Sequence, residues 1–180
     1  MIRHTAGVYQ RARPARYAAP GGTISVESMV SQAALVVLDD YYAVLNRHDV
    51  DGIGDVVSDD LIVHDDLFVD HIVRGPSEFR AALERLWKAV PDLTFTEIHD
   101  PFLADGAPRC AVHGRMTGTL MNEFPTFGWT RVGGSINVEY IAVYEIAVDR
   151  ISYIRLCLNP TITARQVGNP AIAARQVNAA

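Results

Sequence analysis

The residues best suited to proton transfer stand where a short apolar segment gives way to acids. His64 and Asp65 end the run Leu61-Ile-Val-His-Asp65. A histidine beside a carboxylate suits general base catalysis, because the carboxylate orients the imidazole ring and raises its pKa. The same pair can equally be the solvated end of a strand, and the residue types leave both interpretations open.

A metal site in this region is the weaker interpretation. Histidine and carboxylate side chains suit several divalent ions, and the candidate ligands are His64, Asp65, Asp66, Asp70 and His71. Their spacing matches no recognised ligand motif. We therefore do not expect these residues to form a metal site.

Two tyrosines are candidates for binding a carbonyl oxygen. Tyr140 and Tyr144 lie four residues apart in a segment with strand character, and strand residues an even number apart share a face. Phenols on a cavity wall can donate hydrogen bonds to a developing enolate. Buried tyrosines more often only pack and bond one carbonyl, so this role is one of two that the sequence allows.

The hydrophobic pattern predicts helices first and strands afterwards. From Ser31 to Leu45 apolar residues recur at three- and four-residue steps, a second short helix is expected at 50–57, and a third runs from Gly75-Pro76 to its stop at Pro91. Strands are expected at 61–65, 93–99, 109–121, 135–147 and 150–158. This order predicts an α+β fold, in which a conical, curved antiparallel sheet packs against three N-terminal helices and encloses a pocket.

The alternation of the last two strands predicts an apolar pocket wall. Ile154 and Leu156 share one face, and Ala142 shares a face with the two tyrosines. The predicted substrate-binding residues are Leu45, Trp87, Gly114, Ala142, Ile154 and Leu156. Gly114 either enlarges the pocket or bends its strand. The aromatic residues Phe124, Phe127 and Trp129 form either a lid or a small satellite core.

Composition narrows the class of protein. With 180 residues, 49% of them hydrophobic, the chain can build one substantial core. Its net charge of −5, with basic residues interspersed among acids, argues against nucleic acid as a partner. It contains neither an apolar stretch long enough to span a membrane nor a secretory signal, so we expect a cytoplasmic protein with no membrane partner.

The two cysteines, Cys110 and Cys157, have neither the number nor the spacing of a disulfide framework or a zinc site. We expect both to be reduced, buried thiols.

Three regions follow from these patterns. Residues 1–28 are rich in arginine and turn formers and predict a disordered tail, which is either a targeting segment or a stretch upstream of a true start near Met29. Residues 29–168 form the domain. Residues 169–180 repeat the preceding unit: Asn159–Gly168 and Asn169–Asn178 each begin with Asn-Pro, which suits a helix N-terminus. The repeat either packs over the cavity mouth or against a partner, or is a tail.

Several short motifs resemble, in order, those of the SnoaL-like polyketide cyclase family. They are Asp60–Asp65, Arg74-Gly-Pro-Ser-Glu-Phe79, Ala89-Val-Pro-Asp-Leu93, Thr117-Gly-Thr119, Val143-Tyr-Glu-Ile146 and Asp149-Arg-Ile151. The resemblance covers roughly residues 31–168 and implies a conical fold like that of nuclear transport factor two. It also implies an enzyme that needs neither metal nor cofactor.

The resemblance implies a reaction as well as a fold. Known members close polyketide rings by an aldol step, with an acid/base carboxylate on the last strand and a histidine on the strand before it. Those positions fall at Leu156 and Ala142 here. We therefore expect a cyclase or isomerase of secondary metabolism, such as antibiotic biosynthesis, that lacks the usual carboxylate. It would enclose a hydrophobic polyketide-like intermediate in a reactive shape, with His64 or Asp65 moving protons.

Two alternatives remain open at this stage, because a fold does not specify a function. One is a dehydratase or epoxide hydrolase on the same fold, and the other is a non-catalytic small-molecule binding module. The outer face of the last two strands carries Ile141, Val143, Tyr153 and Cys157. An apolar outer face of this kind predicts a homodimer formed through the sheet.

Overall fold

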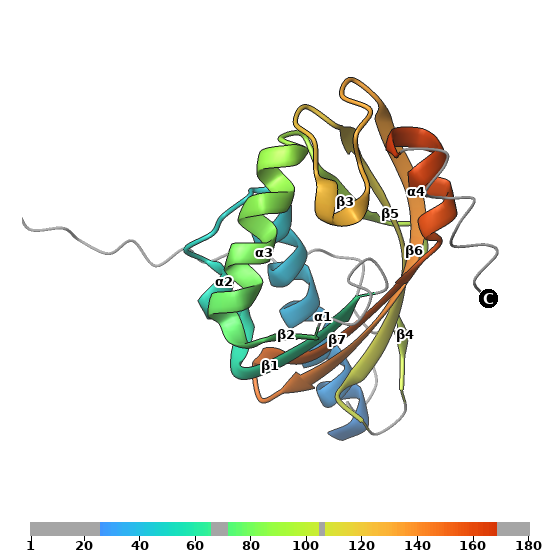
Figure 1. Cartoon of the computed structure of the whole chain (residues 1–180). Coiled ribbons are helices and arrows are strands. Elements are labelled where there is room, and N and C mark those ends of the chain that lie inside the picture. Colours follow the sequence, from blue (N-terminus) through green and yellow to red (C-terminus); the bar gives the residue numbers. More distant parts are fainter. Residues whose placement is uncertain (1–25, 66–71, 105–106, 169–180) are drawn as a thin grey trace, which may run out of the picture.

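The computed structural model describes residues 26–65, 72–104 and 107–168 (Figure 1). In chain order the elements are α1 (Val26–Asn46), α2 (Ile53–Val56), β1 (Val57–Asp65), β2 (Ile72–Arg74), α3 (Gly75–Ala89), β3 (Thr94–Glu97), β4 (Phe102–Leu103), β5 (Arg109–Thr119), the 3-10 turn η2 (Pro125–Phe127), β6 (Ser135–Ala147), β7 (Arg150–Leu158) and α4 (Pro160–Val167).

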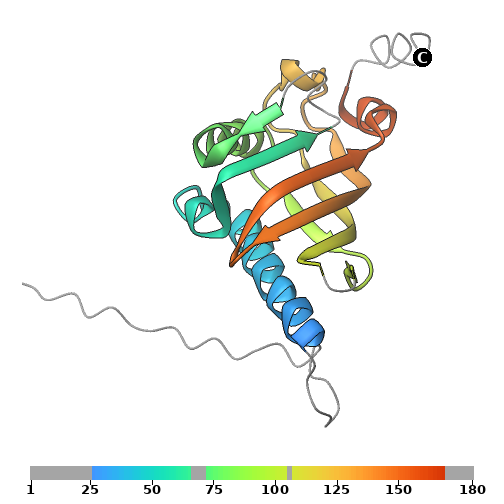
Figure 2. The ribbon, with the colours of Figure 1, turned by 90° about the horizontal axis from the view of Figure 1, so that it is seen from below.

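The strands form one curved sheet with helices against one of its faces, so the predicted α+β class is confirmed. The strand order is β2-β1-β7-β6-β5-β3, and β4 also pairs with β5. Figure 1 shows α1 and α3 on the same side of the sheet, and Figure 2 shows that the N-terminal part of α1 extends beyond it. The core fills the space between these two layers, where Leu38, Leu61 and Val112 are fully buried.

One strand pairing departs from the expected antiparallel order. β1 runs parallel to β7, with Val63 opposite Ile154 and Asp65 opposite Leu156. The other named pairs of described strands are antiparallel. Turn signals in a sequence identify hairpins between neighbouring segments, but β1 ends at Asp65 and β7 begins only at Arg150, so no local signal sets their relative direction.

Three of the main elements, β6, β7 and α3, match the sequence pattern closely. β6 and β7 have the expected bounds, and α3 begins at Gly75 and ends just before Pro91. Glu78 supports the start of α3, since its carboxylate accepts a hydrogen bond of 2.8 Å from the backbone N–H of Arg74. α1 begins at Val26, before the expected Ser31. β2 and β4, with three and two residues, were not predicted because they are too short to show an alternating pattern.

The first unit of the C-terminal repeat forms α4. The Asn159 side chain accepts the Thr161 N–H at 3.0 Å, which is the N-cap expected from the Asn-Pro pair. The helix is tied to β6 beyond the end of β7, because the Gln166 amide bonds the N–H and the carbonyl of Asn137 at 2.9 and 2.8 Å. The second unit at 169–178 and the predicted tail up to residue 25 lie outside the described residues.

Among the described helices, none combines the length and the apolar character needed to cross a membrane.

Candidate active site

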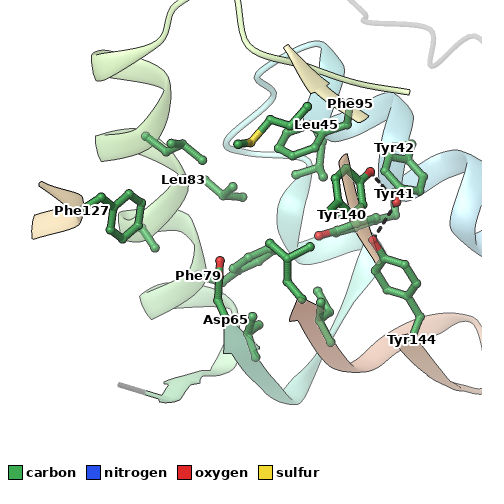
Figure 3. Close-up of a pocket in the computed structure, with 16 residues that line it drawn as sticks. Tyr41, Tyr42, Leu45, Asp65, Phe79, Leu83, Phe95, Phe127, Tyr140 and Tyr144 are labelled. Atoms are coloured by element: carbon green, nitrogen blue, oxygen red, sulfur yellow. Dashed lines mark hydrogen bonds between the residues drawn. The ribbon is translucent and has the colours of Figure 1, made fainter. Parts of the chain in front are cut away.

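A pocket lies between the concave face of the sheet and the helices α1 and α3 (Figure 3). Its cavity volume is about 80 Å³, several times what one water molecule needs. Its lining is mostly apolar and consists of Tyr41, Tyr42, Leu45, Val63, Asp65, Phe79, Ala82, Leu83, Leu86, Phe95, Met116, Phe127, Tyr140, Tyr144, Ile154 and Leu156. The structure therefore favours a compact, hydrophobic occupant.

Three tyrosine hydroxyls meet on one side of this pocket. The Tyr42 hydroxyl shares hydrogen bonds with those of Tyr140, at 3.0 Å, and Tyr144, at 2.8 Å. We call these three residues the tyrosine triad; its dashed bonds appear in Figure 3. The sequence identified the two members on β6 but not Tyr42, which comes from α1. Helical periodicity places Tyr42 toward the core, yet no local signal shows that it reaches across to β6.

Asp65 is the one carboxylate among the described lining residues. It ends β1 directly opposite Leu156 of β7, and Leu156 is in turn opposite Ala142 of β6. Paired residues on adjacent strands point to the same face of a sheet. Asp65 therefore lies in one row across the sheet with Leu156 and Ala142, the two positions that the family resemblance marks for an acid/base pair. It is on β1, the strand next to Leu156.

The structure separates His64 from Asp65. Successive strand residues point to opposite faces, and the His64 ring packs near Tyr153 on the other face of the sheet, with ring centroids 5.6 Å apart. His64 is not among the pocket residues. The hypothesis of a histidine oriented by its neighbouring carboxylate thus has no geometric support, and the parity rule could already have shown this.

Three further predicted binding residues are not among those that line the pocket. Trp87 stacks on His48, with ring centroids 4.9 Å apart, and Ala142 is fully buried within the sheet. Gly114 neither enlarges the pocket nor interrupts the strand register: it lies opposite Tyr140, whose ring occupies the space that a side chain would need. By contrast, Leu45, Ile154 and Leu156 do line the pocket.

The aromatic connection between β5 and β6 is a packed cluster that also reaches the pocket. Phe124, Phe127 and Trp129 are in edge contact, with ring centroids 4.3 to 6.0 Å apart. Phe127 lines the pocket, and Figure 3 shows it across from the tyrosine triad. The contacts therefore favour the interpretation of these three residues as a small satellite core. One of them, Phe127, also forms part of the pocket wall.

The electrostatics of the pocket keep its phenols neutral. Burial raises the pKa of Tyr140 to about 12. Burial likewise raises the pKa values of Tyr42 and Tyr144, and nearby tyrosines raise them further. Neutral phenols act as hydrogen-bond donors rather than bases. Burial also raises the pKa of the Cys110 thiol to about 12, which makes that cysteine a poor nucleophile.

This burial predicts a loss of stability in alkali. A phenol in the unfolded chain has a pKa near 10, whereas that of folded Tyr140 is about 12. Between these values the unfolded state loses protons first, so the stabilisation is complete below about pH 10 and falls as the pH rises toward 12. We expect phenolate absorbance of the triad to appear together with unfolding, followed by circular dichroism. Gradual ionisation near pH 10 in a protein that stays folded would contradict it.

The described residues offer no cluster of three or more His, Cys, Asp or Glu side chains that could hold a metal ion. Asp66, Asp70 and His71, which were named as further candidate ligands, lie outside the described part of the chain.

Comparison with known proteins gives one sequence family and many similar structures. The model of the SnoaL-like domain matches residues 38–154. No curated protein matches the chain. A proposed SnoaL-like polyketide cyclase from Jannaschia sp. CCS1 is 15% identical over 83% of this chain and 99% of its own, with a TM-score of 0.65.

Two other solved structures show the same fold. A SnoaL-like polyketide cyclase from Agrobacterium tumefaciens C58 is 19% identical, covering 73% of this chain and 95% of its own, with a TM-score of 0.58. AclR from Streptomyces galilaeus, a proposed hydroxylase, is 19% identical, covering 72% of this chain and 90% of its own, with a TM-score of 0.58. At these identities the likeness to solved structures shows the fold alone.

Proposed function

This chain belongs to the SnoaL-like family, and from that premise we propose that it is a cofactor-independent cyclase or isomerase acting on a hydrophobic, polyketide-like carbonyl compound. Membership in the family supports a role of the polyketide-cyclase type. The observation that carries the proposal is the placing of Asp65, one carboxylate in an otherwise apolar pocket whose other described polar side chains are phenols.

The chemistry follows from these groups. Asp65 removes a proton from the carbon next to a substrate carbonyl, and the electron pair of the broken C–H bond moves onto the carbonyl oxygen. A phenol hydroxyl donates a hydrogen bond to that oxygen and stabilises the enolate. For isomerisation, Asp65 returns the proton to a different carbon. For ring closure, the enolate carbon attacks a second carbonyl of the same molecule, and the new alkoxide takes up the proton.

The row of paired residues supports Asp65 as the base. The family position for the carboxylate is occupied by Leu156, which cannot transfer a proton, but Asp65 is its direct neighbour on β1. The pocket-facing side of the sheet thus still carries a carboxylate, but on β1 instead of on β7. The expectation drawn from the sequence was that enclosure does most of the catalysis, with His64 or Asp65 moving protons. We propose instead that Asp65 performs acid/base chemistry inside the enclosing wall.

The proposal is tested with a compact model ketone. We expect the protein to accelerate exchange of the acidic C–H hydrogens of 2-tetralone for deuterium in heavy water, followed by proton NMR. Heat-inactivated protein controls for buffer catalysis. Binding of 2-tetralone without accelerated exchange would leave the non-catalytic binding module, and absence of binding would contradict both proposals.

We also propose that the outer face of the sheet pairs with a second copy of this chain. Ile141 is 45% exposed in the middle strand of this face. On either side of it, Arg109 pairs with Glu145 at 2.5 Å and Arg115 with Glu139 at 2.7 Å. An apolar centre with charges of both signs toward its ends is self-complementary under a two-fold rotation.

Substitution at the centre of that face should separate the copies. Ile141→Glu would place a charge in a desolvated interface, so we expect light scattering to change from twice the chain mass of 19.8 kDa to that mass. Val36→Glu is the matched control, because Val36 is similarly exposed but lies on α1. A wild-type protein that is monomeric at micromolar concentration would refute the pairing.

A further inference from the structure

We propose that Tyr41, rather than the tyrosine triad, donates the hydrogen bond that holds the carbonyl oxygen of the substrate. This inference rests on the proposed function and identifies the donor within it. It also assigns the triad a positioning role, because its hydroxyls bond one another.

The triad has little hydrogen-bonding capacity to spare. Three hydroxyls carry three protons, and the two bonds that meet at Tyr42 use two of them. When the central hydroxyl donates one bond and accepts the other, it has no proton left to donate. The network thus ties β6 to α1 and fixes the rings of Tyr140 and Tyr144, while one proton at most remains for any other acceptor.

Tyr41 is in the opposite situation. It lines the pocket and is only 4% exposed. Its hydroxyl takes no part in the hydrogen bonds that join the triad. In Figure 3 the dashed bonds join Tyr42, Tyr140 and Tyr144, and the Tyr41 hydroxyl lies apart from them. The proton of the Tyr41 hydroxyl is therefore not committed to the triad, and it is available to a carbonyl oxygen in the pocket.

The ring of Tyr41 is already held in place. It stacks on Phe79 of α3, with ring centroids 6.5 Å apart and planes 11° from parallel. Its edge contacts with Tyr42 and Tyr144 have ring centroids 5.6 Å apart in both pairs. A donor fixed by packing on three sides loses little conformational freedom when substrate binds, which is the arrangement that stabilises a developing oxyanion best.

The charge around Tyr41 keeps it a donor. Burial raises the pKa of its hydroxyl strongly, and Tyr140 and Asp65 raise it further. The hydroxyl thus stays protonated throughout the pH range in which Asp65 could act as a base. Donor and base come from different elements, α1 and β1, so a substrate would be held between them.

The same groups define the chemical class of the substrate. The described lining is mostly apolar and contains no Lys, Arg or His side chain, so an anionic group in the pocket would lose its hydration without gaining a cation from these residues. The geometry points to a neutral ketone or ester with an acidic C–H next to its carbonyl. Carboxylates and phosphates would be rejected.

The test compares a ketone with a hydrocarbon of the same shape. Calorimetry with 2-tetralone and tetralin measures what the carbonyl contributes, and infrared spectroscopy of bound 2-tetralone reports the hydrogen bond as a shift of the C=O band to lower wavenumber. We expect Tyr41→Phe to weaken 2-tetralone binding about tenfold, to change tetralin binding less than about twofold, and to abolish the band shift. Tyr153→Phe, on the outer face, is the matched control.

The triad provides the discriminating variant. Tyr144→Phe should keep the band shift, because it removes a hydrogen bond within the network and not the one to the ligand. Retention of the shift in Tyr41→Phe together with its loss in Tyr144→Phe would overturn the inference, while binding and deuterium exchange would leave the proposed function standing. Failure of the wild-type protein to bind either probe would overturn both.

Discussion

Replacing Asp65 by asparagine should slow deuterium exchange into 2-tetralone by about 10²-fold or more, because the amide cannot accept the proton that a general base removes. Asparagine is nearly isosteric with aspartate and fits the same place in the lining, so the protein should stay folded with an unchanged circular dichroism spectrum. Binding of 2-tetralone should be retained or strengthened, since the charge is lost and the shape is kept. The measurement is the exchange rate at saturating ketone, compared with the affinity from calorimetry.

Two variants make this result specific. Asp149→Asn changes a carboxylate in the exposed turn between β6 and β7, so it controls for a change of net charge and should leave the rate unaltered. Leu156→Asp combined with Asp65→Asn moves the carboxylate to the position expected from the family resemblance. Partial recovery of exchange in that double variant would support the row argument. An Asp65→Asn protein that exchanges 2-tetralone at the wild-type rate would remove Asp65 from the chemistry altogether.

Gly114→Ala should lower the melting temperature of the protein clearly, although it adds only one methyl group. A Cβ atom at this position would lie 2.4 Å from Cζ and 2.5 Å from the hydroxyl oxygen of Tyr140. The Tyr140 ring would have to move, and its hydrogen bond to Tyr42 would be lost with it. Overpacking of this kind costs about 2 kcal/mol, which corresponds to a fall in Tm of roughly 4–8 °C for a chain of this length.

A matched glycine and a compensating change test the cause. At Gly54 an added Cβ would meet only the end of the Arg80 side chain, which can move away, so Gly54→Ala should cost much less. Adding Tyr140→Leu to Gly114→Ala shortens the obstructing side chain and should recover part of the lost Tm. The prediction fails if Gly114→Ala melts at the wild-type temperature, or if the two glycine variants lose equal stability.

Local patterns in the sequence predicted the elements whose residues are set by local rules. The bounds of β6 and β7 follow from alternation and turn residues, and the start of α3 from Gly75-Pro76. Alternation also placed Tyr140, Tyr144, Ile154 and Leu156 on one face, and all four line the pocket. These features depend on neighbours along the chain, so they are readable without a tertiary structure.

The sequence by itself therefore determined the class of fold, the main elements and the apolar wall of the site, because period and parity are properties of a single segment. Only the tertiary structure decided which polar groups meet inside. The parallel pairing of β1 with β7 brings Asp65 beside Leu156. The packing of α1 brings Tyr42 into contact with β6 and leaves the Tyr41 hydroxyl outside the hydrogen bonds of the triad. Those relations join segments far apart in the chain, and they depend on how the layers pack, which no local spacing encodes.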